Sequence, residues 1–199
     1  MNLLDSDGEI LVKMARAVVT EYLKTRKIIM LQEDFKSRFS YNSGVFVTLN
    51  KAKDLRGCVG FPTPEKMLYQ SLIDAAIASA AQDPRFPPIR YEELRDITFE
   101  VTVLTPPVEV RAENTLEYPS KIKVGRDGLI VRWELGSGLL LPQVPIEYGW
   151  NEEEFLNHTC EKAGAPKDYW KRRETKILRF EGIIFKERSP NGAVVRVSL

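Results

Sequence analysis

The residues best suited to chemistry form the pentapeptide Arg56-Gly57-Cys58-Val59-Gly60, which lies between two strand-like runs and a helix-like run. It places a thiol between two glycines, with a guanidinium two residues before it and a predicted helix start shortly after it. Glycine lets the backbone adopt φ > 0 or approach a ligand closely. Arginine and a helix N-terminus both favour thiolate over thiol. We therefore predict Cys58 and Arg56 as catalytic residues and Gly57 and Gly60 as binding residues.

A structural interpretation of Cys58 stands beside the functional one. Free cysteine is among the most buried residue types and often acts as a small hydrophobe. If functional, Cys58 acts as a nucleophile, a redox thiol or a ligand for a soft metal. His158 is the only histidine, so a zinc site would need carboxylates brought in by folding, and a Cys58–His158 pair has little support. We predict no metal and no cofactor.

The second cysteine has a more ordinary expected role. Cys160 lies on the apolar stripe of a predicted helix, four residues after Leu156 and three before Ala163. Such spacing favours packing in the core. His158 falls off that stripe and is expected at the surface.

A proline-rich segment provides a second candidate wall for the site. In Asp83-Pro84-Arg85-Phe86-Pro87-Pro88, three prolines fix a loop from which a carboxylate and a guanidinium project. The segment either stops a helix, with Asp83 and Arg85 capping it or pairing with each other, or forms a preorganised wall beside Cys58. One helix separates this loop from the pentapeptide, so the two meet only if the fold brings the loop back. We predict Asp83 and Arg85 as binding residues.

Residues 136–145 form a glycine-rich turn followed by an apolar stretch. Gly136-Ser137-Gly138 resembles part of a phosphate loop but lacks its lysine and its full spacing. The leucines at 139–141 are either an exposed partner surface or an ordinary buried strand, and we favour burial.

The pattern of the first half predicts a hairpin and the helices around it. Gly44 to Leu49 and Leu55 to Gly60 read as two strands, while Thr63 and Pro64 read as a helix start. The predicted elements are a helix over 6–26, a hairpin of 44–49 and 55–60, a helix over 64–83 and a strand over 98–104.

The second half repeats this order. Its predicted elements are a hairpin of 121–124 and 129–135, a helix over 152–163, a strand over 177–186 and a last strand over 193–198. The fold class is therefore α+β with mostly antiparallel sheet and packed helices. The repeated order suggests two β-hairpin–helix–strand units related by internal duplication. We expect one domain over 1–199, with lobes of about 1–110 and 111–199.

Composition limits the classes of partner. A chain of 199 residues with 43% hydrophobic and 29% charged residues is typical of a globular protein with a core. A net charge of +1 argues against nucleic-acid binding through bulk charge, although residues 171–173 form a short basic run. Neither a signal peptide nor a long apolar span is apparent, so we expect a cytoplasmic protein that does not bind membranes.

Several of these segments together resemble the AMMECR domain family, also called protein A of the AmmeMemoRadiSam system. The resemblance is carried by Leu55–Gly60, Asp83–Pro88, Leu140–Val144, Gly149-Trp150, Phe155-Leu156 and Lys162–Gly164. It implies a compact α+β domain, a signature that marks a functional site, and association with a Memo-type protein and a radical-SAM protein. It implies no particular reaction.

Two functions remain open. The first is a pocket around the pentapeptide, in which Cys58 acts as nucleophile or thiol ligand on a small-molecule or protein substrate and Arg56 holds the thiolate or an anion. The second is a non-catalytic adaptor for a Memo-type or radical-SAM protein, which docks through the signature loop and residues 139–144. The sequence leaves open whether the protein is an enzyme.

Overall fold

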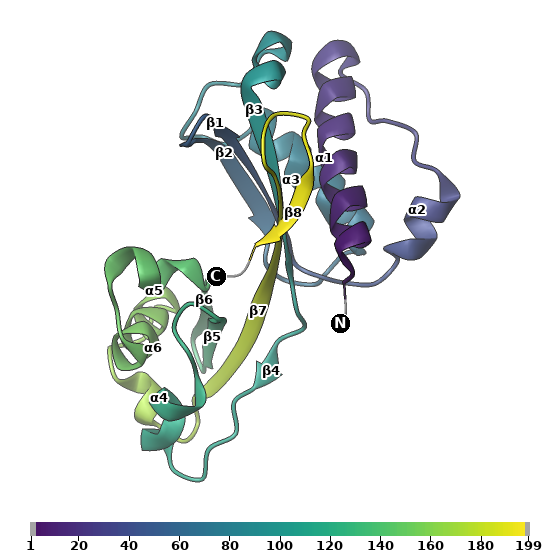
Figure 1. The fold of residues 1–199 in the computed structure, drawn as a ribbon. Helices are drawn as coiled ribbons and strands as arrows, with labels where there is room; N and C mark the ends of the chain where they lie inside the picture. The colour runs from purple at the N-terminus through teal and green to yellow at the C-terminus, as the bar shows by residue number, and fades with distance from the viewer. Residues whose placement is uncertain (1–2, 198–199) are drawn as a thin grey trace. The chain divides into compact units, whose positions relative to one another are not determined.

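The computed structural model describes residues 3–197, and this part of the chain contains eight strands (Figure 1). It divides into two compact units, residues 3–104 with 183–197 and residues 105–182. The predicted α+β class with antiparallel strand pairing is confirmed. The segment 183–197 belongs to the first unit, although it comes at the end of the chain.

Unit 1 consists of an antiparallel sheet with helices packed on one face (Figure 1). Within it, strand β1 lies between β2 and β3, and β8 pairs with the end of β7. Its elements are α1 (Asp5–Thr25), α2 (Glu33–Arg38), β1 (Val45–Lys51), β2 (Asp54–Phe61), α3 (Leu68–Ala81), a 3₁₀ helix (Tyr91–Asp96), β3 (Ile97–Leu104), the end of β7 (Lys176–Glu187) and β8 (Val194–Val197).

Alternation along β1 decides which face of this sheet is buried. Val45, Val47 and Leu49 are fully buried and point toward the helices, whereas Phe46 and Thr48 point to the other face. We call the face that carries Phe46 and Thr48 the outer face. The helix-facing side chains join those of α1 and α3 in one hydrophobic core.

Close approach of α3 to β2 requires a glycine. A Cβ added at Gly57 would overlap the backbone carbonyl oxygen of Ser79, which lies in the last turn of α3. The Ser79 hydroxyl accepts a hydrogen bond from the Val59 N–H (2.8 Å) and donates one to the Val47 carbonyl (2.7 Å). The alanine-rich end of α3 is thus fastened to the middle of β2.

Unit 2 has the same order of hairpin, helix and returning strand. Its hairpin consists of β5 and β6, and β7 returns beside β5, just as β3 returns beside β1 in unit 1. Its elements are β4 (Val108–Glu109), a 3₁₀ helix (Thr115–Glu117), α4 (Tyr118–Lys121), β5 (Asp127–Trp133), β6 (Gly136–Leu140), α5 (Gln143–Tyr148), α6 (Glu152–Lys162), a 3₁₀ helix (Tyr169–Lys171) and the start of β7.

Two predicted elements are wrong in position. The second helix begins at Leu68 rather than at Pro64, because Met67 forms a bridge with Asn42 and the Leu68 N–H donates to the Tyr41 carbonyl, which keeps the preceding chain extended. The predicted strand 121–124 is absent from the described hairpin of unit 2, which pairs β5 with β6.

The segment Gly136–Gly138, which the sequence predicted as a turn, is part of strand β6. The buried Asp127 carboxylate accepts a hydrogen bond from the Lys123 N–H and closes the turn that starts β5. A Cβ at Gly138 would overlap the backbone at Ala163, just after α6. Leu139 and Leu140 are half-buried, which lies between the exposed surface and the buried strand that the sequence left open. The lobe boundaries and the common origin of the two units stay predictions.

We predict that Gly57→Ala lowers the free energy of unfolding by roughly 1–3 kcal/mol, because an added methyl group must displace the α3 backbone. Chemical denaturation followed by circular dichroism measures this loss. Asp54→Ala, at the exposed end of the same strand, is the control and should change stability by less than about 0.5 kcal/mol. Equal stability of the two variants would contradict the close approach of α3.

Candidate functional site

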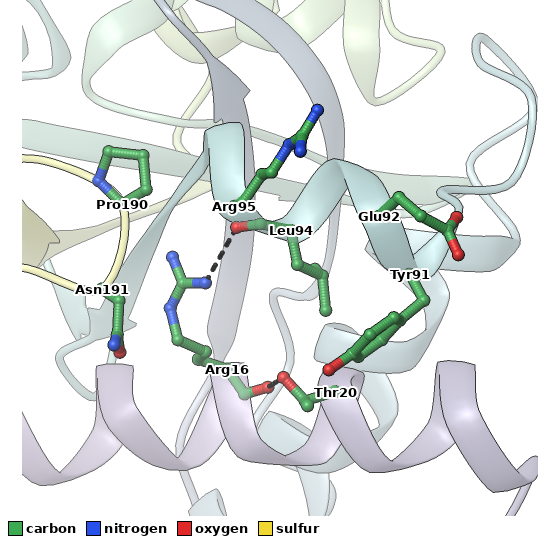
Figure 2. Close-up of a pocket in the computed structure, with 8 residues that line it drawn as sticks. All are labelled: Arg16, Thr20, Tyr91, Glu92, Leu94, Arg95, Pro190 and Asn191. Carbon is green, nitrogen blue, oxygen red and sulfur yellow. Dashed lines mark hydrogen bonds between the residues drawn. The ribbon is translucent and has the colours of Figure 1, made fainter.

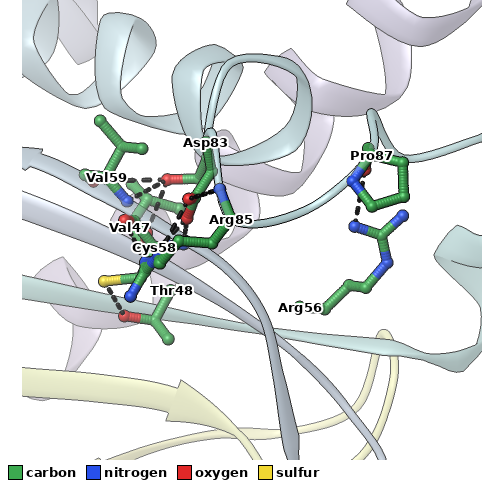
Figure 3. A network of polar contacts seen from close by, with 9 residues as sticks. Val47, Thr48, Arg56, Cys58, Val59, Asp83, Arg85 and Pro87 are labelled. Atoms are coloured by element: carbon green, nitrogen blue, oxygen red, sulfur yellow. Dashed lines mark hydrogen bonds and ion pairs between the residues drawn. The ribbon is translucent and has the colours of Figure 1, made fainter.

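Cys58 lies in β2, the edge strand of the unit 1 sheet, and is half-buried. Its cross-strand partner is Thr48 in β1, so both side chains are on the outer face. The Thr48 hydroxyl donates a hydrogen bond to the Cys58 sulfur at 3.3 Å (Figure 3). The thiol is therefore held beside a hydroxyl on the face opposite the helices.

Asp83 and Arg85 bind the backbone of Cys58 along the free edge of β2 (Figure 3). The Cys58 N–H donates to Asp83 Oδ2 at 2.8 Å, and Arg85 Nη2 donates to the Cys58 carbonyl at 3.0 Å. The two side chains are joined by bonds from Arg85 Nε to Oδ1 (3.0 Å) and from Nη2 to Oδ2 (2.8 Å). The ion pair thus satisfies the edge groups that another strand would otherwise pair.

This contact answers whether the proline-rich loop reaches the pentapeptide. Helix α3 packs along β2 and ends at Ala81, so the loop that follows it lies beside Cys58. The same geometry contradicts one sequence argument. The helix terminus next to Cys58 is the carboxyl end of α3, whereas we expected a helix N-terminus close after the pentapeptide.

Electrostatics keep the Asp83–Arg85 pair ionised. Hydrogen bonding to Arg85 holds the pKa of the Asp83 carboxyl well below its usual range, against the opposing effect of burial, and the Cys58 N–H adds to this. Asp83 is only 5% exposed. The Asp83 carboxylate raises the pKa of Arg85, and the Cys58 thiol adds a smaller contribution in the same direction. Arg85 is therefore the guanidinium that interacts electrostatically with Cys58.

Arg56 makes different contacts from those we expected. It is the extra residue of a β-bulge, since Leu49 pairs with Gly57 and Asn50 pairs with Leu55. Its guanidinium donates to the Pro87 carbonyl (2.8 Å) and forms an ion pair with Glu93 (3.3 Å). A backbone hydrogen bond at Arg90 is the main cause that lowers the pKa of Glu93, and Arg56 adds to it. Arg56 therefore fastens the proline-rich segment to the sheet (Figure 3).

Gly57 and Gly60 both have packing reasons to be glycine. Gly57 faces the end of α3, and a Cβ at Gly60 would overlap the Phe46 ring and the Val45 carbonyl oxygen. Neither has a positive φ. Their binding roles stay predictions, and both glycines keep the strand on either side of Cys58 closely packed.

Sequence reasoning missed two side chains on the outer face. Thr48 stands directly opposite Cys58 on one side and opposite Glu100 of β3 on the other. Burial raises the pKa of Glu100, while the charge of Lys186 in β7 lowers it less. The alternation of Thr98, Glu100 and Thr102 was visible in the sequence, but the register that aligns Glu100 with Cys58 was not.

The other candidates lie elsewhere. Cys160 is fully buried in the core of unit 2, and burial raises its pKa to about 11, so its predicted packing role is confirmed. His158, in unit 2, stacks on Trp150 and bonds to Glu161. Within residues 3–197, no three His, Cys, Asp or Glu side chains lie close enough to hold a metal ion. None of the helices described combines the length and apolar character needed to cross a membrane.

Unit 1 also contains a separate cavity of about 510 Å³ between α1, the 3₁₀ helix 91–96 and residues 190–191 (Figure 2). Arg16 lines it, and its guanidinium bonds to the Leu94 and Ile97 carbonyls and to the buried Glu187. The Arg16 charge that faces this cavity is therefore already paired within the fold.

These features define a class: an α+β protein whose leucine-arginine-glycine-cysteine strand is held by an aspartate–arginine pair. The AMMECR1 family model matches residues 12–185, and the chain belongs to that family. Protein PYRAB00100 of Pyrococcus abyssi is 52% identical, over 98% of this chain and 97% of the relative. Protein MJ0810 of Methanocaldococcus jannaschii is 47% identical, over 97% and 96%.

A solved structure supports the same relationship. The crystal structure of the uncharacterized protein PH0010 from Pyrococcus horikoshii has a TM-score of 0.86 and 50% sequence identity. The match covers 99% of both chains. The fold described here is therefore shared along the whole length of that relative.

We predict that Asp83→Asn lowers the free energy of unfolding by about 1–3 kcal/mol at neutral pH, because the charge that holds Arg85 and the Cys58 N–H is lost. The folded pKa of Asp83 is depressed, so its stabilisation is present above the unfolded value near 4 and is lost as the pH falls below it.

Urea denaturation as a function of pH tests this sign. The difference between wild type and Asp83→Asn should shrink as the pH falls below about 4. Asp74→Asn removes an exposed ion pair with Lys66 and is the matched control. A difference that stayed constant through the acid range would show that the Asp83 charge does not carry the effect.

Proposed function

We propose that this protein is a cytosolic thiol-dependent protein in which Cys58 is a nucleophile on the outer face of the unit 1 sheet. The observation that carries the proposal is a pair of hydrogen bonds: the Cys58 N–H donates to the Asp83 carboxylate, and the Arg85 guanidinium donates to the Cys58 carbonyl. These two bonds hold the Cys58 backbone in place, and the sulfur lies beside the Thr48 hydroxyl. A thiol whose surroundings are held in place in this way is typical of nucleophile sites. The resemblance to the AMMECR family, whose signature contains this cysteine, supports the choice.

The roles within the site follow from the contacts. Thr48 supplies a hydrogen bond to the Cys58 sulfur, which orients the nucleophile. Arg85 supplies positive charge and is half-exposed, so it also offers an anchor for an anionic group of a substrate. Arg56 and Glu93 support the loop that carries Arg85. The pocket that we expect around residues 56–60 would receive a small-molecule or protein substrate.

Selective alkylation tests the proposal. Iodoacetamide should label Cys58 in the native protein near neutral pH and leave Cys160 unlabelled, because Cys160 is buried. Peptide mass spectrometry assigns the labelled residue. Thr48→Val keeps the shape and removes the hydrogen bond, so the rate should fall roughly fivefold, as a loss of about 1 kcal/mol implies.

Thr98→Val is the matched control, since Thr98 lies on β3 and does not touch the sulfur. Its labelling rate should equal that of the wild type. If Cys58 reacted only after unfolding, it would be a packing residue and the nucleophile proposal would fail.

A second function is favoured by the surface of unit 2. Two large apolar side chains just after the predicted docking stretch 139–144 are exposed: Ile146 (52%) and Tyr148 (68%). Such a group of side chains fits a protein-binding surface. The resemblance implies Memo-type and radical-SAM proteins as its partners, for which the chain would act as an adaptor.

Co-purification with a radical-SAM or Memo-type protein distinguishes the adaptor from the enzyme. Ile146→Asp should abolish binding and leave the fold intact, because Ile146 is exposed, whereas Leu140 packs against the core of unit 2. Cys58→Ser should bind normally if the protein is only an adaptor. Binding that survived Ile146→Asp would remove this surface from consideration.

A further inference from the structure

Four side chains of different chemistry form a row across the outer face of unit 1. Thr48 of β1 is directly opposite Cys58 of β2 and directly opposite Glu100 of β3. Neighbouring strands are about 4.8 Å apart, so Cys58 and Glu100 lie roughly 10 Å from each other with Thr48 between them. We call Cys58, Thr48, Glu100 and Lys186 the outer row.

Lys186 extends the row onto β7. Its neighbours Phe185 and Glu187 are buried, and Glu187 bonds to Arg16 of α1, so alternation places Lys186 on the opposite, outer face. Its ammonium is close enough to Glu100 to act on it electrostatically. The row thus contains a thiol, a hydroxyl, a carboxyl and an ammonium group.

An aromatic wall borders the row. The Phe46 ring covers Gly60, and Phe46 also stands opposite Thr102 of β3. An apolar wall beside a few convergent polar groups is the usual construction of a small-molecule site. Because residue 60 is a glycine, the Phe46 ring can lie over β2 at this position.

Glu100 differs from a carboxyl group on a solvent-exposed face of a sheet. It is half-buried, and burial raises its pKa more than Lys186 lowers it. A carboxylate with a raised pKa is a stronger base near neutrality than an exposed one. This property, together with its position in the row, suits Glu100 for proton transfer.

We propose that the outer row is an acyl-transfer site, in which Cys58 accepts an acyl group and Glu100 is the general base that hydrolyses it. This inference rests on the proposed function, the nucleophilic thiol, and adds to it a substrate class and a second catalytic residue. The substrate is a compound with an activated acyl group, such as an ester or a thioester.

The chemistry balances without an oxidant or a cofactor. In the first step the Cys58 thiol gives its proton to solvent, its sulfur bonds to the acyl carbon, and the leaving group departs with the bonding electron pair. In the second step a water oxygen attacks the thioester carbon while the Glu100 carboxylate takes the water proton. The carbon–sulfur bond then breaks, and the sulfur is reprotonated from Glu100 or solvent. The net reaction is hydrolysis of the acyl compound.

The strand register fixes the order of the groups that take part in both steps. An acyl group on Cys58 that extends over Thr48 points its carbonyl carbon toward Glu100. The strands of Cys58 and Glu100 are about 10 Å apart with Thr48 between them, so the acyl carbon and the attacking water would lie above Thr48 on the outer face. The Thr48 hydroxyl, which already bonds to the sulfur, stabilises the thiolate that leaves in the second step.

p-Nitrophenyl acetate tests the inference in the full chain. The wild type should release a burst of p-nitrophenolate equal to the concentration of Cys58, followed by steady turnover. Glu100→Gln keeps the size and removes the base, so it should retain the burst but reduce steady turnover at least tenfold, with acetyl-Cys58 detected by mass spectrometry. Glu100→Asp should restore part of the turnover. Glu9→Gln, on the exposed face of α1, is the matched control.

The outcomes separate the two proposals. Absence of a burst in the wild type, or a burst that persisted in Cys58→Ser, would overturn the nucleophile and with it the acyl-transfer site. A normal burst with equal steady turnover in wild type and Glu100→Gln would overturn only the role of Glu100. Glutamine removes a charge from a half-buried position, so the variant should fold, and its unfolding midpoint confirms this.

Discussion

The candidate site depends on one ion pair, in which Asp83 and Arg85 hold the backbone of Cys58 at the free edge of β2. An edge strand presents unpaired N–H and C=O groups that invite another chain to pair. Here a buried carboxylate and its arginine take that place without adding a strand. The ion pair that satisfies the hydrogen-bonding groups of the β2 edge also positions the Cys58 sulfur. The stability of the edge strand and the reactivity of the thiol therefore depend on the same contacts. Loss of Asp83 would therefore affect stability and thiol reactivity together.

Glycine makes this arrangement possible, and it does so in both units. In unit 1, Gly57 lets the end of α3 approach β2, which brings the loop after the helix to Cys58. In unit 2, Gly138 of β6 lies against the backbone just after α6 in the same way. In each unit the glycine is in the second hairpin strand and meets the end of a later helix, α3 in unit 1 and α6 in unit 2. This shared detail, together with the shared strand order, supports the hypothesis of duplication more strongly than element order alone.

Local patterns predicted the parts of the fold that depend on local signals. The hairpin of β1 and β2, helix α6 and strand β3 were predicted within a few residues, because alternation, turn residues and capping are encoded nearby. The start of α3 was wrong because a distant contact with Tyr41 decides it. Asp83 and Arg85 were predicted as binding residues, but their contact with Cys58 depends on how α3 packs. Glu100 was missed because only strand register places it in the row.

Hydrogen exchange at the Cys58 amide tests the central claim most directly. An outward-facing amide of an unpaired edge strand exchanges quickly, whereas one bonded to a buried carboxylate is protected. NMR exchange on the wild type should show a protected Cys58 N–H that becomes fast-exchanging in Asp83→Ala, while the Val47 amide in β1 stays protected in both. Rapid exchange of the Cys58 amide in the wild type would contradict the account, because Asp83 would then not hold the strand that carries the thiol.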